Sequence, residues 1–259
     1  MITPETLFTG KNKIYLQQVP STNAYALELI AKTTPSEGTC VFTDYQSAGR
    51  GQIGRFWHSE PGMNVLISYI FYPKTLLLRD QFYLNVFSAL AVRDLVALYC
   101  DDVKIKWPND IYVGNKKIAG ILVQNTLRSN HLRASVIGIG LNVNEKSFPE
   151  DIPNPVSISQ QTSMTYDLKE IISLLSSKLE YYYLKMNAGQ YQLLRSQYLN
   201  AMYRKLVPAN FTVGGDKAIS GIIQGIDEQG RLQVLSDNIV TAYDFREIAY
   251  IIKSNSCQL

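Results

Sequence analysis

The segment VIGIGLNV, residues 136–143, predicts a β-strand whose two faces differ sharply. Successive side chains of a strand point to opposite sides of the sheet, so Ile137, Ile139, Leu141 and Val143 share one face and Gly138, Gly140 and Asn142 share the other. The aliphatic face predicts a buried core. Two glycines in alternate positions weaken a strand and indicate that something lies flat against the backbone. A bound ligand and a tightly packed protein element explain this bare face equally well.

Strands and helices are predicted on both sides of this segment. Short runs rich in β-branched, aromatic and aliphatic residues predict strands at 14–16, 39–45, 63–72, 103–107, 111–113 and 116–123. Amphipathic or largely apolar runs predict helices at 24–31, 80–99, 168–186 and 191–202. In the strand at 116–123, simple alternation puts Lys117 on the face of Ala119 and turns Ile118 the other way. We therefore expect an α/β (α+β) fold, with one mixed sheet, helices packed on one face and a ligand on the other.

The composition changes near Leu206. Beyond it, short β-rich runs are separated by turn sequences at 214–215, 227–230 and 236–238. Such spacing predicts a small all-β barrel. We expect a catalytic domain at 1–205 and a C-terminal barrel domain at 206–259.

Composition excludes several classes of protein. The 25 basic and 22 acidic residues give a net charge of +3, too small to indicate nucleic-acid binding, although it leaves room for an anionic ligand. Cys40, Cys100 and Cys257 form no C-x-x-C pair, and His58 and His131 lie far apart, so each histidine is interpreted as an ordinary loop or strand-end residue. This usage fits a reducing cytoplasm rather than a zinc site or a disulfide framework. The N-terminus has no signal-peptide pattern, and no run approaches the ~18 apolar residues of a membrane span.

The segment GRGQIGR, residues 49–55, contains a literal G-x-G-x-x-G. A dinucleotide-binding fingerprint needs a strand before the glycines and a helix that starts at them. The strand is predicted, but Pro61, Gly62 and the next strand exclude the helix. The glycines therefore lie in a long loop where backbone can surround an anion, with Arg50 and Arg55 as cations; a plain surface loop is the simpler alternative. We expect this loop, residues 49–62, to be mobile until a ligand binds and then to close over it.

Ser21, Thr22 and Asn23 precede the first predicted helix. The simplest interpretation is a helix N-cap. Two hydroxyls and an amide beside the free backbone N–H groups of a helix start also suit a small polar ligand. The two interpretations are compatible.

A further polar group surrounds the turn Pro108-Asn109-Asp110. Lys104 and Lys106 precede the turn on one face of a strand, a pattern that usually means only a solvated face. Lys117 follows on a neighbouring strand. Together with the arginine loop and the bare glycine strand, this group could hold a carboxylate against a polyphosphate and stabilise an in-line displacement at phosphorus.

These ordered motifs resemble those of the biotin protein ligases, or biotin–acetyl-CoA-carboxylase ligases. The resemblance covers about residues 14–252. It implies a two-step reaction, in which the carboxylate of biotin attacks the α-phosphorus of ATP to give biotinyl-5′-adenylate and pyrophosphate. A lysine of a biotin carboxyl carrier protein or domain, from acetyl-CoA carboxylase or a related carboxylase, then attacks the anhydride to form an amide. The motifs that carry the resemblance are Ser21-Thr22-Asn23, Gln46 with Gly49-Arg50-Gly51, Gly54-Arg55 and Trp57, Lys106-Trp107-Pro108-Asn109-Asp110, Lys117-Ile118-Ala119-Gly120-Ile121, and Gly138-Ile139-Gly140-Leu141-Asn142.

The resemblance also implies roles for single residues. Lys117, placed between the carboxylate and the α-phosphate, and Arg50 would be catalytic, and Asp110 would hold Mg²⁺ with Asn109 and Asn142 nearby. The biotin-binding residues would be Ser21, Thr22, Asn23, Gln46, Arg50, Gly51, Gln52, Lys117, Gly120 and Gly138. The ATP-binding residues would be Arg50, Arg55, Lys106, Asn109, Asp110, Lys117, Asn142 and, on the adenine side, Trp57.

Two departures from the family pattern matter. Gln52 stands where many relatives carry a third arginine, which predicts weaker retention of the adenylate. About 20 residues precede Ser21, too few for the DNA-binding domain of some relatives, so we expect a monofunctional enzyme without a nucleic-acid or membrane partner. A homodimer is compatible with the sequence.

Two rival functions stay open. Lipoate protein ligases share the expected architecture and a similar lysine, although the Ser-Thr-Asn and Arg/Gly motifs favour biotin. A biotin-binding regulator without catalysis is the other, and Lys117, Asp110 and Asn142 argue against it because a simple binder needs no metal and phosphate site.

Overall fold

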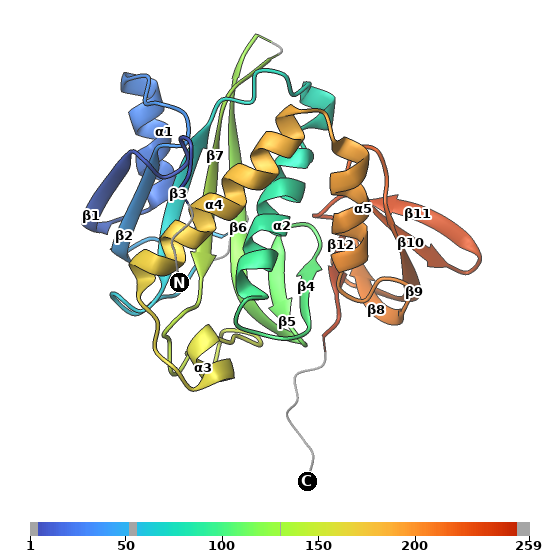
Figure 1. Cartoon of the computed structure of the whole chain (residues 1–259). Coiled ribbons are helices and arrows are strands. Elements are labelled where there is room, and N and C mark those ends of the chain that lie inside the picture. The colour runs from blue at the N-terminus through green and yellow to red at the C-terminus, as the bar shows by residue number, and fades with distance from the viewer. Residues whose placement is uncertain (1–4, 52–55, 130, 253–259) are drawn as a thin grey trace.

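A seven-stranded mixed sheet, with the strand order β1-β2-β3-β7-β6-β5-β4, forms the larger part of the structure (Figure 1). The computed structural model describes residues 5–51, 56–129 and 131–252. β1 and β2 are parallel, and the other neighbours are antiparallel. The strands are β1 (Lys13–Val19), β2 (Cys40–Gln46), β3 (Val65–Phe71), β4 (Val103–Lys106), β5 (Asp110–Val113), β6 (Lys116–Arg128) and β7 (His131–Leu141). The predicted mixed sheet is confirmed.

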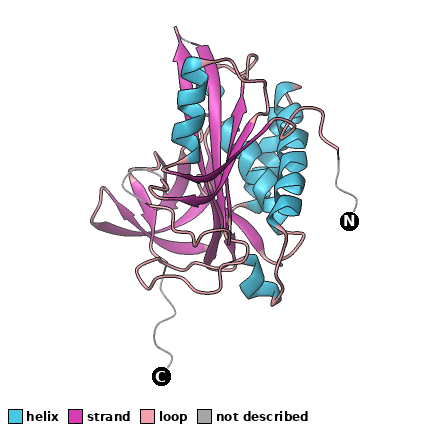
Figure 2. Ribbon diagram, turned by 90° about the vertical axis from the view of Figure 1, so that its left-hand side faces the viewer, coloured by secondary structure: helices cyan, strands magenta, loops and turns pink. Residues whose placement is uncertain are grey.

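Helices cover this sheet unequally on its two faces (Figure 2). The long helices α2 and α4, with α5, pack on one face, as predicted, and the apolar residues of β3 and β7 share a core with them. Helix α1 lies on the other face, where Ala26 and Ile30 pack with Val41, Ile70 and Val136. The helices are α1 (Thr22–Lys32), η1 (Leu78–Asp80), α2 (Tyr83–Val96), α3 (Ile158–Thr162), α4 (Leu168–Asn187) and α5 (Tyr191–Ala201). In the described ranges, no helix has the length and apolarity needed to cross a membrane.

The C-terminal part is all-β, as predicted, and forms a five-stranded antiparallel sheet with the order β11-β10-β9-β8-β12. Its apolar side is continuous with the main core, because Phe211, Ile223 and Leu232 belong to the same buried cluster as the residues of α2 and β7. Trp107 Nε1 adds a buried hydrogen bond to Gly230 O at 2.8 Å. The strands are β8 (Pro208–Val213), β9 (Lys217–Ile226), β10 (Leu232–Ser236), β11 (Ile239–Tyr243) and β12 (Ile248–Tyr250). The division into domains at residue 206 stays a prediction.

Candidate active site

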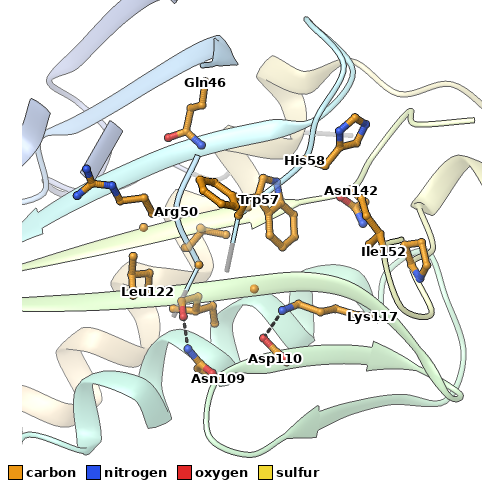
Figure 3. A pocket seen from close by; sticks show the side chains of 18 of the residues that line it. Gln46, Arg50, Trp57, His58, Asn109, Asp110, Lys117, Leu122, Asn142 and Ile152 are labelled. Atoms are coloured by element: carbon orange, nitrogen blue, oxygen red, sulfur yellow. Dashed lines mark hydrogen bonds and ion pairs between the residues drawn. The ribbon is translucent and has the colours of Figure 1, made fainter. Parts of the chain in front are cut away.

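A pocket of about 190 Å³ opens on the sheet face that carries α1 (Figure 3). Its walls come from the start of α1, the end of β2, strands β5, β6 and β7, and the segments around Trp57 and Pro153. Most of the predicted site residues meet here, although they are far apart in the sequence. Those that line the pocket are Ser21, Thr22, Asn23, Gln46, Arg50, Gly51, Trp57, Asn109, Asp110, Lys117, Gly120, Gly138 and Asn142.

Three predicted residues are not among them. Gln52 and Arg55 lie outside the described residues, so their roles stay predictions. Lys106 pairs with Asp110 across β4 and β5, and its ammonium lies 5.5 Å from the ring centroid of Tyr112 and 4.7 Å from that of Tyr250. Tyr112 lines the pocket and Tyr250 belongs to the C-terminal sheet, so Lys106 joins the two; a contact with ATP stays a prediction.

The catalytic lysine predicted by the sequence reaches the pocket through a β-bulge. Ile111 pairs with Ala119 and Tyr112 pairs with Lys117, so Ile118 is an extra residue on β6. Ile118 and Ala119 are both buried in the core. The expected shared face of Lys117 and Ala119 is therefore wrong. The bulge turns the side chain of Lys117 to the face on which Gly120 lies. A Cβ atom added to Gly120 would lie only 3.2 Å from Lys117 Nζ.

Lys117 is held by an ion pair within the pocket. Its Nζ lies 2.6 Å from Asp110 Oδ1, and its side chain is 28% exposed (Figure 3). Its backbone N–H donates to Asn154 O at 2.6 Å and its carbonyl accepts from Val156 N at 2.9 Å, so the segment around Pro155 runs along the strand. The ammonium also lies 5.7 Å from the ring centroid of Trp57. A cation paired with a carboxylate is thus held within the pocket.

The bare face of β7 is covered by protein side chains in this structure. A Cβ on Gly138 would lie 2.2 Å from Asn23 Oδ1, and one on Gly140 would lie 2.4 Å from Trp57 Cε2. Protein side chains therefore pack against both glycines, and both glycines also line the pocket, so the ligand explanation stays a prediction beside the packing that is seen. The indole of Trp57 also approaches Gly120, where a Cβ would lie 3.0 Å from its Cζ3 atom.

The end of the pocket near α1 is rich in hydrogen bonds. Ser21 is the N-cap of α1, as predicted, and its side chain accepts from Ala24 N at 3.5 Å. Gln46 Oε1 accepts from Thr22 N at 2.8 Å. Asn23 is 4% exposed and bridges α1 and β6 through its amide. The polar groups at this end are therefore fixed before any ligand binds.

Two buried polar atoms at the opposite end lack a hydrogen-bond partner among the described residues, namely Asn142 Oδ1 and Trp57 Nε1. Asn142 Nδ2 donates to Val156 O at 3.0 Å, which fixes the direction of the amide. Asn109 is used differently, since its Nδ2 donates to the carbonyl of Ile121 and ties the turn to β6 (Figure 3). Unpaired buried polar atoms are rare and need an explanation, and here they suit a polar ligand.

Within the loop at residues 49–62, Arg50 and Phe56 pair with each other in an isolated β-bridge. Beside it, Trp57 N donates to Gly49 O at 3.0 Å. Farther along, the buried carboxylate of Glu145 accepts from Glu60 N at 3.0 Å and from Asn64 Nδ2 at 2.7 Å. Both bases of the loop are anchored, and its closure on ligand binding stays a prediction.

Sequence reasoning missed several residues of the pocket wall. His58, interpreted as an ordinary loop residue, lines the pocket, with its Nε2 atom 4.0 Å from Glu60 Oε1. Its position next to Trp57 is the signal that could have found it. The others are Phe56, Tyr112, Ile121, Leu122, Ile139, Phe148, Ile152, Pro153 and Pro155. Most of these come from strand positions or from a proline-rich segment with no chemical signature, so only the folded chain shows their place.

Comparisons with known proteins agree with this geometry. The profile of the Biotin/lipoate A/B protein ligase family matches residues 15–142, and that of the Biotin protein ligase C terminal domain matches residues 210–242. A Salmonella typhimurium protein named bifunctional ligase/repressor BirA is 32% identical over 250 residues, which cover 92% of this chain and 74% of that protein. A Paracoccus denitrificans protein named biotin--[acetyl-CoA-carboxylase] ligase is 29% identical over 84% of this chain and 91% of its own length. Two Bacillus relatives are matched over only 52% of their length.

Among solved structures, the chain is similar to a biotin protein ligase from Aquifex aeolicus in complex with biotin and ATP. The identity is 25% and the TM-score is 0.77. The match covers 94% of this chain and 100% of that one.

Proposed function

The chain belongs to the biotin protein ligase family, and from this premise we propose that it activates biotin with ATP and transfers the biotinyl group to a carrier protein. In the first step a carboxylate oxygen of biotin bonds to the α-phosphorus of ATP, and pyrophosphate leaves. In the second step a lysine amine of the carrier bonds to the acyl carbon, AMP leaves, and the nitrogen loses a proton. The observation that carries the proposal is the ammonium of Lys117 inside the pocket.

Lys117 meets the main electrostatic demand of the first step. A carboxylate and a phosphate repel each other, and a cation between them lowers the energy of the approach and of the charge that develops at phosphorus. Lysine suits this role because its ammonium is a compact charge on a flexible stem. Its present partner, Asp110, holds it in the pocket, and the anionic substrates would draw it away. Arg50, which also lines the pocket, would add a second cation beside the phosphate.

The polar end of the pocket supports biotin as the acid. Ser21, Thr22 and Gln46 offer hydroxyl and amide groups at fixed positions, which suit the ureido ring. The match to the biotin protein ligase C-terminal domain supports the same choice over lipoate.

The residues near Asp110 fit Mg²⁺, which favours a few protein oxygens and completes its octahedron with substrate phosphates and water. The unpaired Oδ1 of Asn142 and the carboxylate of Asp110 are such oxygens, and these two residues would hold the ion. Bound there, it would neutralise charge on the triphosphate. Within the described residues, no cluster of three or more His, Cys, Asp or Glu side chains offers a self-sufficient metal site.

We propose a carrier and a cellular location on the basis of the relatives and of the cysteines. The name of the Paracoccus relative supports a biotin carboxyl carrier domain as the acceptor. Cys40 and Cys100 are free thiols, and burial raises their pKa to about 12 and about 11, so neither is a nucleophile at neutral pH. Free cysteines are compatible with the proposed reducing cytoplasm.

The proposal is tested by measuring the exchange of labelled pyrophosphate into ATP with biotin or lipoate as the carboxylic acid substrate. We expect exchange with biotin and Mg²⁺ and none with lipoate, followed by labelling of a purified carrier domain. Exchange that occurs with lipoate but not with biotin would indicate a lipoate protein ligase. Binding of biotin without exchange would favour a regulator, and either result would overturn the proposal.

A further inference from the structure

A tyrosine on the helix side of the sheet is bonded to the turn that brings Asp110 into the pocket. The turn comprises residues 107–109, because Lys106 and Asp110 form the last pair between β4 and β5. Tyr198, on α5, donates from its hydroxyl to the carbonyl oxygen of Pro108 at 3.0 Å. The bond joins two residues that are 90 positions apart in the sequence. Helix α5 is therefore tied to the backbone of the turn directly before the pocket residues Asn109 and Asp110.

The position of the Tyr198 hydroxyl is fixed by the packing of its ring. Tyr198 is fully buried in the main core, and its ring meets that of Phe82 edge to face, with centroids 6.0 Å apart and an angle of 82° between the planes. This is a favoured arrangement of two aromatic rings. Phe82 is itself enclosed, because a Cβ added to Gly230 would lie only 2.1 Å from its Cγ atom. The hydroxyl is thus a rigid support for the Pro108 carbonyl.

Two further hydrogen bonds hold the residues on either side of Pro108. Trp107 Nε1 donates to Gly230 O, between β9 and β10, at 2.8 Å. Asn109 O accepts from Ile121 N, on β6, at 3.1 Å. Since proline has no backbone N–H, its carbonyl oxygen is the polar group by which the middle of the turn can be held. Each residue of the turn is therefore bonded to a different part of the fold.

The place of the turn determines the place of the ion pair in the pocket. Asp110 directly follows the turn, and its Oδ1 atom lies 2.6 Å from Lys117 Nζ (Figure 3). The Asp110 side chain is only 15% exposed, so it has little room to move independently of its backbone. A shift of the turn would therefore displace the Asp110 carboxylate and, with it, the Lys117 ammonium.

We propose that Tyr198 is a positioning residue for the reaction, which acts by holding the Pro108 carbonyl and thereby sets the positions of Asp110 and Lys117. Tyr198 is not part of the pocket lining, so its effect passes through the turn. The inference rests on the proposed function, in which Lys117 stands between the two anions of the first step. A displacement of about 1 Å caused far from the reacting atoms can cost about 10²-fold in rate.

The test compares two substitutions that each remove one hydroxyl oxygen from a buried tyrosine and leave its ring in place. Tyr198→Phe removes the bond to Pro108. The control is Tyr69→Phe, because Tyr69 is equally buried in the same core and its hydroxyl shares a 2.8 Å hydrogen bond with Ser176 Oγ on α4. Tyr69 does not line the pocket. Thermal melting followed by circular dichroism compares the stabilities, and biotin-dependent pyrophosphate exchange is measured at a temperature at which all three proteins are folded.

We expect both variants to melt at similarly lowered temperatures, since each loses one buried hydrogen bond. In Tyr198→Phe, kcat of the exchange should fall about tenfold or more, while KM for biotin stays within about twofold of the wild-type value. A fall in kcat without a better or worse KM is the sign of an interaction that acts in the transition state. In Tyr69→Phe, both kcat and KM should stay within about twofold.

Two results overturn the inference and leave the proposed function intact. One is a kcat in Tyr198→Phe that is no lower than in Tyr69→Phe, because the hydroxyl would then serve stability alone. The other is a rise in KM for biotin as large as the fall in kcat, because the whole pocket would then be loosened rather than its catalytic end displaced. Absence of biotin-dependent exchange in the wild type overturns the proposed function and the inference together.

Discussion

The two ends of the pocket are built in opposite ways. At the end formed by Ser21, Thr22 and Gln46, the polar groups form hydrogen bonds within the protein. Ser68 on β3 adds contacts to Thr22 and Asn23. At the other end, Asn142 Oδ1 and Trp57 Nε1 have no partner among the described residues, and the cation Lys117 forms an ion pair with Asp110.

We interpret this difference as a division of work, in which one end of the pocket recognises biotin and the other end binds ATP and carries out the reaction. A preorganised polar end identifies a small neutral ring at little cost in ordering. The other end has to accept highly charged substrates, and its groups find their partners when these arrive. Substitutions at the first end should therefore act on the affinity for biotin, and those at the second on ATP and on the rate.

Removal of the Lys117 ammonium should have the largest effect. Lys117→Ala should lower biotin-dependent exchange at least about 10³-fold, because nothing else at that position compensates two approaching anions. Biotin affinity, measured by calorimetry, should fall far less. Lys116→Ala, the exposed neighbour on the same strand, should keep near wild-type exchange. A folded Lys117→Ala variant with intact turnover would refute the proposed chemistry.

The next largest effect is expected at Asn142. Asn142→Leu removes the unpaired oxygen and should lower exchange by about 10²-fold, with a higher KM for ATP and a greater requirement for Mg²⁺. A magnesium titration of the exchange rate measures this. Asn125→Leu, on the neighbouring strand β6, serves as the control. An unaltered magnesium dependence would remove Asn142 from the proposed ion site.

Two glycine substitutions on one strand compare the ends directly. A methyl at Gly140 meets Trp57, and one at Gly138 meets Asn23. We expect Gly140→Ala to raise KM for ATP about tenfold and Gly138→Ala to raise KM for biotin about tenfold, each with little effect on the other substrate. Steady-state kinetics with each substrate varied in turn gives both constants. If both variants impair both substrates equally, the two ends are not independent.

The smallest effect is expected from Gln52→Arg. An added cation at residue 52 should slow release of biotinyl-5′-AMP by about threefold, since a single added charge usually contributes little. Release is followed in a chase experiment without carrier protein. Equal release rates in the two proteins would contradict the prediction.

The sequence predicted the site residues better than their directions. The glycine strand, the N-cap and the Pro-Asn-Asp turn were recognisable because each depends on neighbours in the sequence. The direction of Lys117 was missed, because the bulge at Ile118 arises from pairing with β5. The position of α1 on the ligand face was not predicted either, since the path of the chain decides it.

The bulge at Ile118 has a consequence for how this lineage can vary. β6 has one extra residue between Lys117 and Gly120, compared with the facing residues of β5, and Lys117 therefore points into the pocket. With no extra residue, or with two, Lys117 would point into the hydrophobic core. We expect selection to remove insertions or deletions of one residue between Lys117 and Gly120, because they would turn Lys117 away from the pocket. Selection on this stretch therefore acts on the number of residues in the strand as well as on the lysine itself.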